Sequence, residues 1–277
     1  MTERVALITG ASSGIGEATA RRLRRLGYTV YAGARRVERM GDLAELGIHA
    51  VALDVTDDAS MVGLVDRIIG ETGRIDVLVN NAGYGAYGAL EEVPLAEARR
   101  QFEVNLFGLA RLTQLVLPHM RAQRAGRIIN VSSVGGRIYG PLGAWYHAAK
   151  FSVEGLSDAL RLELAPFGIL VVIIEPGAIK TEWGTIAADA LLETSGSGPY
   201  ADQAGAVAAV VAGTARDGGI GSPPSVVAEA IGRAAQARRP KTRYVVGRGA
   251  RPLLLARWIL PDRAFDRVIR ILFRLND

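Results

Sequence analysis

The sequence predicts an α/β protein in which a doubly wound parallel sheet of about seven strands carries helices on both faces. Short segments rich in Val, Ile, Leu and Ala alternate with longer segments of helical periodicity along most of the chain. Several of the short segments are apolar almost without interruption, as in parallel strands buried on both faces. The first of them ends in a glycine-rich turn that opens a helix, which is typical of Rossmann-type sheets.

Each expected element follows from its own stretch of sequence. Strands are expected where β-branched and apolar residues run together, at 4–9, 28–32, 48–53, 76–80, 127–132, 169–174 and 243–246. Helices are expected where apolar residues recur every three to four positions, at about 14–26, 58–70, 95–124, 144–166 and 224–237. Each helix would form a right-handed crossover between parallel strands.

The chain is expected to form one domain over residues 1–277, because 49% of its residues are hydrophobic and can bury a single large core. A segment rich in Gly, Ala and Ser at about 184–222 follows the sixth expected strand. We interpret it as a substrate-loop insertion rather than a linker, since a seventh strand follows. Insertions at this edge of a sheet often act as lids. Residues 251–277 form a basic, helical C-terminal extension.

Composition excludes several classes of site. The chain has no cysteine, which excludes disulfides, thiolate nucleophiles and cysteine-ligated metals. Its three histidines, His49, His119 and His147, lack metal-ligand spacing, so no metal is expected. No apolar run reaches the ~18 residues that a membrane span needs. The N-terminal residues lack a secretory pattern, and we therefore expect a cytoplasmic protein.

Positive charge is concentrated near the C-terminus. The net charge is +5, and residues 238–277 hold 11 Arg or Lys against three Asp or Glu. Such a region can bind nucleic acid, an anionic membrane or an acidic partner. Nucleic acid is not expected, because no aromatic residues interleave the arginines for base stacking. The amphipathic pattern of 263–275 favours a helix that packs on the domain or covers the pocket, with peripheral membrane contact as the alternative.

The turn after the first strand has the spacing G-x-x-x-G-x-G. Glycine permits a tight turn and a close approach of backbone to ligand. The helix that follows offers free amides and the positive end of its dipole, which suit a pyrophosphate. A glycine-rich turn can also be purely structural, but its place between the first strand and the first helix favours a nucleotide. The expected contacts are Gly10, Ser12, Ser13, Gly14, Ile15 and Gly16.

The end of the second expected strand selects the cofactor. An acidic residue there would hold the ribose hydroxyls of NAD, and this chain has none. It carries Arg35 and Arg36 instead, and arginine offers a permanently charged fork for phosphate. We therefore expect NADP(H), with Arg35 as the stronger candidate. The alternative is that both arginines are ordinary surface charges.

Tyr146 and Lys150 are four residues apart in an expected helix and so share one face. A tyrosine, with an ordinary pKa near ~10, is a poor base at neutral pH. A neighbouring ammonium, together with the positive nicotinamide of an oxidised cofactor, would lower that pKa. Ser132 and Ser133, at the end of the fifth expected strand, are both candidates for a hydrogen bond to the substrate oxygen.

Taken in order, these motifs resemble the short-chain dehydrogenase/reductase family. The resemblance covers about residues 4–182 and includes several motifs in the family's order, which makes it far more specific than any one of them. The matching residues are Thr9-Gly10-x-x-x-Gly14-Ile15-Gly16, Asp54-Val55, Asn80-Asn81-Ala82-Gly83, Asn105, Ser133, Tyr146-x-x-x-Lys150 and Pro176-Gly177.

The resemblance implies a role for each residue. Tyr146 would be the general acid in reduction and the base in oxidation, and Lys150 would lower the tyrosine pKa and bind the nicotinamide ribose. Ser133, rather than Ser132, would polarise the carbonyl, and Asn105 would hold a water of a proton relay. The cofactor would contact Asp54 and Val55 at its adenine, Asn81, Ala82 and Gly83 along its length, and Pro176, Gly177, Ile179 and Thr181 at its nicotinamide end. Asp54 could alternatively cap the helix that starts near Asp57, and Thr181 is expected to cap the helix after it as well.

These features predict an oxidoreductase that transfers a hydride between NADP(H) and a carbonyl or secondary alcohol. Apolar residues after Ser133 and near Trp183 indicate a hydrophobic small-molecule substrate. The alternatives are a non-catalytic NADP(H)-binding regulator, and a dehydratase or epimerase on the same scaffold. The family resemblance also implies a homodimer or homotetramer that forms through the helices at 95–124 and 144–166.

Overall fold

The computed structural model describes residues 3–216 and 218–275. Its centre is a seven-stranded parallel sheet in the order β3-β2-β1-β4-β5-β6-β7, which confirms the predicted fold class. The strand order reverses between β1 and β4, and open α/β sheets bind their ligands outside this reversal. The strands are β1 (Arg4–Thr9), β2 (Tyr28–Ala34), β3 (His49–Ala52), β4 (Val77–Asn80), β5 (Gly126–Val131), β6 (Ile169–Pro176) and β7 (Arg243–Val246).

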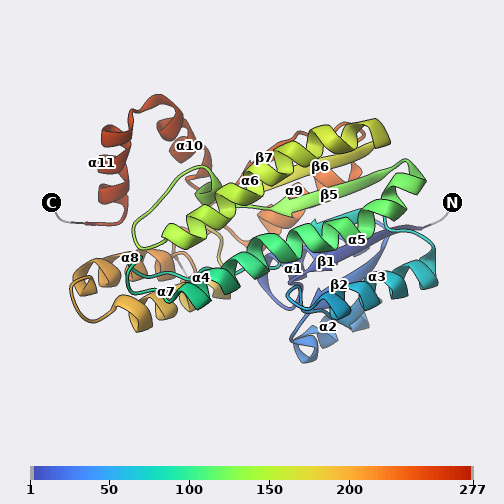
Figure 1. Cartoon of the computed structure of the whole chain (residues 1–277), viewed down its shortest axis with the longest axis horizontal. Helices are drawn as coiled ribbons and strands as arrows, with labels where there is room; N and C mark the ends of the chain where they lie inside the picture. The colour runs from blue at the N-terminus through green and yellow to red at the C-terminus, as the bar shows by residue number, and fades with distance from the viewer. Residues whose placement is uncertain (1–2, 217, 276–277) are drawn as a thin grey trace.

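Helices cover both faces of the sheet (Figure 1). Alternate residues of β1 enter different cores, since Ile8 packs with residues of α1 and α9, whereas Leu7 packs with residues of α3 and α5. The helices that flank the sheet are α1 (Gly14–Arg25), α2 (Gly41–Glu45), α3 (Asp58–Thr72), α4 (Leu95–Phe102), α5 (Gly108–Gln123), α6 (Ala144–Leu164) and α9 (Pro224–Gln236). Short 3₁₀ turns lie at η1 (Val37–Met40), η3 (Val134–Gly136) and η4 (Ala165–Phe167).

The helix expected at 95–124 is not continuous. A π-helical turn, η2 (Glu103–Phe107), separates α4 from α5. Such turns insert one extra residue and are frequent at functional sites. This one contains Asn105, and the apolar periodicity of the surrounding helix conceals it in the sequence.

The insertion at about 184–222 is mostly helical, which corrects the expectation of a loop. Residues in it form α7 (Glu182–Ser195) and α8 (Ala201–Gly213), which pack against each other. Their shared core is built from small and apolar side chains, among them Ala187, Leu191, Ala204 and Val207. Alanine favours helix strongly, so the composition that suggested a loop is equally compatible with tightly packed helices.

The C-terminal extension forms α10 (Ala250–Ile259) and α11 (Asp262–Leu272), at one end of the molecule (Figure 1). The apolar face of α11 is covered at its centre, where Phe265 and Ile269 are buried against Ile138, whereas Ile271 and Leu272 at its end are exposed. The Tyr139 hydroxyl donates a hydrogen bond of 2.8 Å to Asp266 on the same helix. Packing on the domain, one of the expectations for this extension, is therefore observed for α11. Every helix in the described residues is too short or too polar to cross a membrane.

Candidate active site

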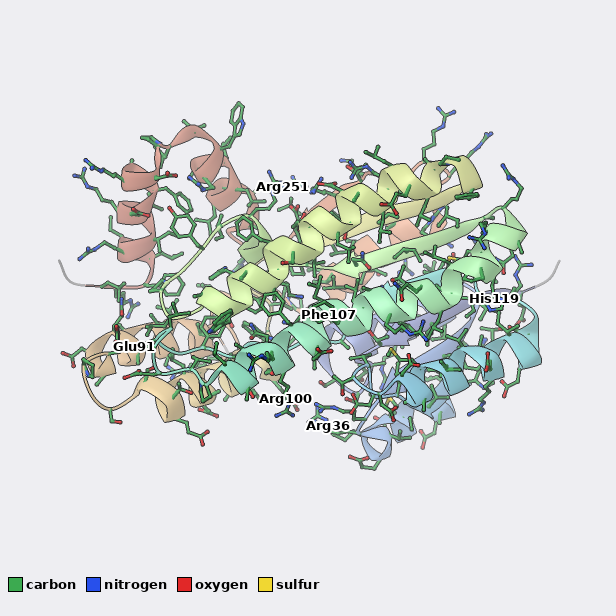
Figure 2. The ribbon with its side chains drawn as sticks, in the orientation of Figure 1. Arg36, Glu91, Arg100, Phe107, His119 and Arg251 are labelled. Atoms are coloured by element: carbon green, nitrogen blue, oxygen red, sulfur yellow. The ribbon has the colours of Figure 1, made fainter. Side chains whose placement is uncertain are left out.

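The predicted cofactor and catalytic residues gather at the carboxyl edge of the sheet. Asn81 follows β4, Ser133 follows β5, and Pro176 ends β6. Figure 2 shows His119 at the end of the molecule opposite Glu91, near the start of β5 rather than its carboxyl end.

The glycine-rich turn fits a pyrophosphate. Gly10 and Gly14 have φ angles of +66° and +58°, a conformation that favours glycine. The first helical hydrogen bond of α1 runs from the Glu17 amide to the Ser13 carbonyl, so the three preceding amides remain available to an anion. A Cβ atom on Gly16 would lie 2.2 Å from the Gly10 carbonyl oxygen. The turn therefore excludes side chains where a phosphate and the backbone must approach each other.

Asn81 braces this turn from β4. Its side-chain Nδ2 donates to the carbonyls of Thr9 (2.9 Å) and Gly10 (3.2 Å). In return, the Thr9 hydroxyl accepts from the amides of Asn81 (3.0 Å) and Ala82 (2.9 Å). Asn81 and Ala82 thus hold the phosphate turn in place. Beside them, Ser13 precedes α1 in extended conformation and makes no side-chain capping bond.

The arginines after β2 face different partners. Arg36 lies 3.7 Å from Glu182, the first residue of α7. Arg39 binds the same carboxylate at both oxygens, at 3.1 and 2.5 Å. Arg35 is exposed and lies near Asp54. Burial by itself would raise the pKa of Asp54, but the hydrogen bonds from Thr56 and the charge of Arg35 lower it below its ordinary value. Arg35 is therefore better placed than Arg36 for an exogenous phosphate.

The capping alternative is wrong for Asp54, and for Thr181 it holds in position only. The Asp54 carboxylate accepts from Thr56, at 2.9 Å from its amide, while Asp57 caps α3 by accepting from the Ala59 amide at 3.0 Å. Thr181 occupies the capping position of α7 but makes no capping bond. Its Cγ2 methyl lies 3.0 Å from the position of a Cβ on Gly14, so Thr181 borders the phosphate turn.

The other predicted contacts lie along the same edge. Val55 is 8% exposed and lies against Gly108 at the start of α5. The Gly177 amide donates to the Val246 carbonyl at 2.8 Å, which joins the end of β6 to β7. Ile179 is 8% exposed and forms a bridge to Ser222. These bonds fix the backbone at the expected nicotinamide end.

Tyr146 is buried, and Ser133 lies close to it. Tyr146 is 7% exposed, and the Ser133 side chain is close enough to its phenol to influence the pKa of that group. Burial raises the pKa of Tyr146 to about 12, and the nearby Ser133 hydroxyl opposes that rise. The Ser132 hydroxyl points elsewhere, toward Gly136 and Glu154 of α6. The structure therefore distinguishes the two serines that spacing alone left open.

Lys150 is also buried near the end of β5, but its ammonium binds the backbone of that strand rather than the Tyr146 phenol. Its Nζ donates to the Val131 carbonyl at 2.9 Å. Burial lowers the pKa of Lys150 to about 8, and the charge of Glu154 opposes the shift. The protein's own groups do not show the expected lowering of the Tyr146 pKa by Lys150, because burial of the phenol dominates and the ammonium is bound to β5.

Asn105 lies beside Lys150 across Gly83. A Cβ on Gly83 would be 3.1 Å from the Asn105 Oδ1 and 3.7 Å from the Lys150 Nζ, so glycine allows the two groups to approach. The Asn105 amide is engaged with the backbone of Tyr84, accepting at 3.0 Å and donating at 2.8 Å. Asn105 thus holds the segment after β4, and its role in a proton relay stays a prediction.

Sequence reasoning missed an aromatic cluster that surrounds Tyr146. The rings of Trp183 and Tyr87 have centroids 5.2 and 5.6 Å from that of Tyr146. Glycine provides the space for them, since a Cβ on Gly85 would be 2.7 Å from Trp183 and one on Gly143 would be 2.8 Å from Tyr87. The signal was present in the sequence as two tyrosines among small residues directly after Asn81-Ala82-Gly83.

A buried charged cluster behind Lys150 was also missed. Glu175 is fully buried and lies 3.0 Å from the Arg243 Nε, while Glu154 lies 3.0 Å from the Arg243 Nη2. Burial raises the pKa of both carboxyl groups. A glutamate at the end of an otherwise apolar strand was the visible sign of this cluster.

Curated relatives of this chain are reductases and oxidoreductases. One is an uncharacterized oxidoreductase, YusZ, of Bacillus subtilis, with 36% identity over 98% of each chain. Another is an NADPH-dependent 3-dehydrocapnine reductase of Ornithobacterium rhinotracheale, with 36% identity over 96% of this chain and 95% of that one. A 3-ketodihydrosphingosine reductase of Bacteroides thetaiotaomicron is 44% identical over 65% of this chain and 66% of that one.

Solved structures that resemble this chain are also short-chain dehydrogenases and oxidoreductases. A short-chain dehydrogenase from Streptomyces avermitilis superposes with a TM-score of 0.83 and 34% identity over the whole of both chains. A metagenomic short-chain oxidoreductase in complex with NADP (TM-score 0.68, 28% identity) covers 88% of this chain and 96% of its own. A Burkholderia phymatum enzyme in complex with NAD (0.79, 25%) covers 96% and 95%. Residues 4–190 match the family described as short chain dehydrogenase, and the chain belongs to the short-chain dehydrogenase/reductase family.

Proposed function

We propose that this protein is an NADP(H)-dependent oxidoreductase that interconverts a carbonyl and a secondary alcohol on a hydrophobic substrate, with Tyr146 as general acid and base. The observation that carries the proposal is the proximity of Ser133 to the buried phenol of Tyr146, with the buried Lys150 one turn further along the same helix. A regulator that only senses a dinucleotide would not require this arrangement.

The cofactor would bind across the carboxyl edge of the sheet. Amides at the start of α1 would hold its pyrophosphate, and Arg35 would bind a 2′-phosphate. The relative whose name specifies NADPH supports this preference, although structural neighbours include complexes with NADP and with NAD. When bound, a nicotinamide supplies the hydride.

The chain's own residues would then position the substrate and move one proton. Ser133 would donate a hydrogen bond to the carbonyl oxygen, and Tyr146 would give its phenolic proton to that oxygen as the alkoxide forms. The cation of Lys150 would stabilise the resulting phenolate. Because Tyr146 is buried among aromatic rings, bulk water would be excluded from the transfer.

The side chains around Tyr146 indicate the class of substrate. Apolar side chains surround Tyr146, including Leu142, Trp183 and Phe273. Two relatives have names that describe 3-keto or 3-dehydro substrates, and one of these contains a sphingosine skeleton. We therefore propose a ketone attached to a long apolar chain.

We also propose a homodimer or homotetramer that forms through α5 and α6. Three large apolar side chains are exposed at these helices and at η2: Phe107 is 53% exposed, Phe151 46% and Leu162 73%. Phe107 lies between the ribbons of α5 and α6 in Figure 2. Size-exclusion chromatography with light scattering would give the mass of the protein in solution. The mass of a monomer would contradict the proposal.

A screen of NADPH and NADH oxidation tests the activity. The substrates would be 3-ketodihydrosphingosine, 2-alkanones of increasing chain length and a short water-soluble ketone. We expect kcat/KM to rise with chain length and NADPH to exceed NADH. Faster turnover with NADH would contradict the role of Arg35. Conversion without net NADPH oxidation would indicate the dehydratase or epimerase alternative.

A further inference from the structure

Helix α10 presents an apolar face to solvent. Leu255, Trp258 and Ile259 are spaced as one face of a helix, and they are 55%, 78% and 62% exposed. The opposite side of α10 is covered, since Leu253 and Leu254 pack with Phe265 of α11. A tryptophan and two aliphatic residues exposed together are unusual on a surface that binds nothing.

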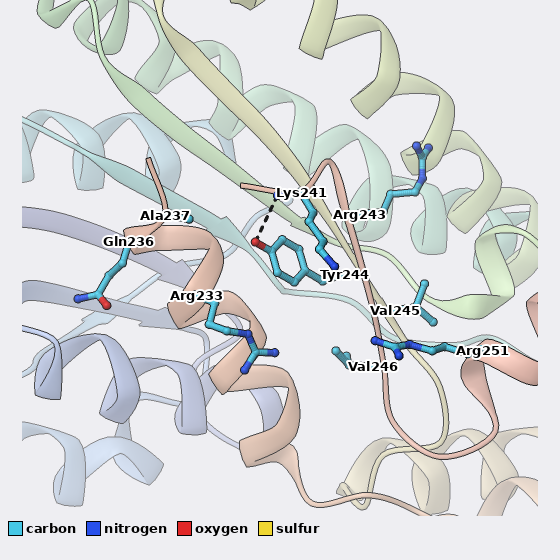
Figure 3. Close-up of a pocket in the computed structure, with 9 residues that line it drawn as sticks. All are labelled: Arg233, Gln236, Ala237, Lys241, Arg243, Tyr244, Val245, Val246 and Arg251. Carbon is cyan, nitrogen blue, oxygen red and sulfur yellow. Dashed lines mark hydrogen bonds between the residues drawn. The ribbon is translucent and has the colours of Figure 1, made fainter. Parts of the chain in front are cut away.

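Cationic side chains continue this face. Arg251 lies one turn before Leu255 on α10, and it also lines an open groove of about 970 Å³ between α9 and β7. Figure 3 shows Arg233, Lys241 and Arg251 around that groove. Among the described residues that line it, four are basic and none is acidic. The fourth, Arg243, is bound to buried carboxylates and is not available.

We propose that this surface, comprising the apolar face of α10 and the cations of the β7 groove, docks the protein on an anionic lipid bilayer. Aliphatic side chains and tryptophan would enter the interface, and the three cations would bind lipid phosphates. Arg251 belongs to both parts, so the apolar and cationic regions are contiguous. The membrane contact lies on α10 rather than on the centre of the apolar face of α11, because Phe265 and Ile269 there are buried against the domain.

The same extension reaches the candidate active site. The Phe273 ring, directly after α11, lies 3.1 Å from the position of a Cβ on Gly140, and it packs in the apolar cluster that contains Tyr146 and Trp183. The docking surface and the pocket are therefore linked through two packed helices. Docking would thus bring the apolar cluster around Tyr146 close to a long-chain ketone dissolved in the bilayer. This step rests on the proposed function.

Co-sedimentation with vesicles tests the docking. The full chain would be mixed with vesicles of phosphatidylcholine alone, or with 30% phosphatidylglycerol as a chosen anionic fraction. We expect binding only to the anionic vesicles. The double substitution Trp258→Ser/Ile259→Ser should reduce the partition coefficient at least tenfold. Lys241→Gln/Arg251→Gln should reduce it about 25-fold, at roughly fivefold per charge.

Matched controls separate docking from general effects. Leu90 is 62% exposed, as Ile259 is, and Leu90→Ser should bind vesicles normally. Arg25→Gln/Arg99→Gln removes the same charge from exposed positions elsewhere and should cause a much smaller loss of vesicle binding.

Turnover of the short water-soluble ketone should be unchanged in the docking variants, so failure of docking and failure of the enzyme are distinguishable. Equal binding by the wild type and both docking variants would overturn the proposal. So would a change of oligomeric mass in Trp258→Ser/Ile259→Ser without loss of vesicle binding, because the face would then join copies of the chain.

Discussion

Replacing Lys150 by methionine should abolish turnover and yet stabilise the folded protein near neutral pH. Burial lowers the pKa of Lys150 from 10.5 to about 8, so folding disfavours its charged form. Below pH 8 Lys150 is charged in both the folded protein and the unfolded chain, so its burial destabilises the folded protein by the full amount. Between pH 8 and 10.5 the lysine is mostly neutral in the folded protein and mostly charged in the unfolded chain, so the destabilisation decreases as the pH rises. Above pH 10.5 the lysine is neutral in both states, and the destabilisation is lost.

The size of the effect follows from the same pKa values. Their difference of about 2.5 corresponds to about 3 kcal/mol, at ~1.36 kcal/mol for each tenfold change. Methionine keeps most of the volume but loses the hydrogen bond to the Val131 carbonyl, which costs about 1 kcal/mol. A net gain of about 2 kcal/mol in the free energy of unfolding remains, or about 4–8 °C in Tm for a protein of this size.

Thermal unfolding at pH 7.0 and pH 9.5 would measure this gain. We expect Lys150→Met to melt above the wild type at pH 7.0 and the gap to narrow at pH 9.5. Lys241 is exposed, so Lys241→Met is the matched control and should not change Tm at either pH. A lower Tm for Lys150→Met at pH 7.0, or a gap that is independent of pH, would refute the argument that burial of this cation is maintained for function.

Three further predictions concern the cofactor turn and the acid. Gly16→Val places a side chain 2.2 Å from the Gly10 carbonyl and should raise the NADPH Kd more than 100-fold, whereas Gly63→Ala, where a Cβ meets open space, should bind normally in the same fluorescence titration. Arg35→Gln should raise the Kd for NADPH about 10–100-fold and leave that for NADH unchanged, from the usual strength of charge-assisted hydrogen bonds; equal weakening of both would assign Arg35 a structural role. Because burial raises the pKa of Tyr146 to about 12, kcat for ketone reduction should be constant between pH 6 and 8, and kcat for alcohol oxidation should rise over that range; a falling oxidation rate would contradict the assignment.

Much of the fold could be predicted because its signals are local. Runs such as ILVVII in β6 and the glycine spacing after β1 depend on neighbouring residues only. The alternation of strands and helices then limits the sheet to few topologies. The helices α7 and α8 were missed since their alanine-rich sequence was interpreted as a loop.

Parts of the site could not be predicted because they depend on contacts across the fold. Spacing could not separate Ser132 from Ser133, but their opposite orientations at the end of β5 do. Burial, and not the neighbouring cation, sets the direction of the Tyr146 pKa shift, and burial depends on side chains from several distant segments. The contact of Arg39 with Glu182 joins residues 143 positions apart, and no local pattern indicates it.

The catalytic role of the phenol can be measured directly in Tyr146→Phe, which removes one oxygen from a buried ring. Steady-state reduction of the best ketone and titration with NADPH would be compared with the wild type. The account predicts that kcat falls about 10²–10⁴-fold, the usual contribution of a general acid, while the NADPH Kd changes less than threefold. Turnover within about threefold of the wild type would contradict it.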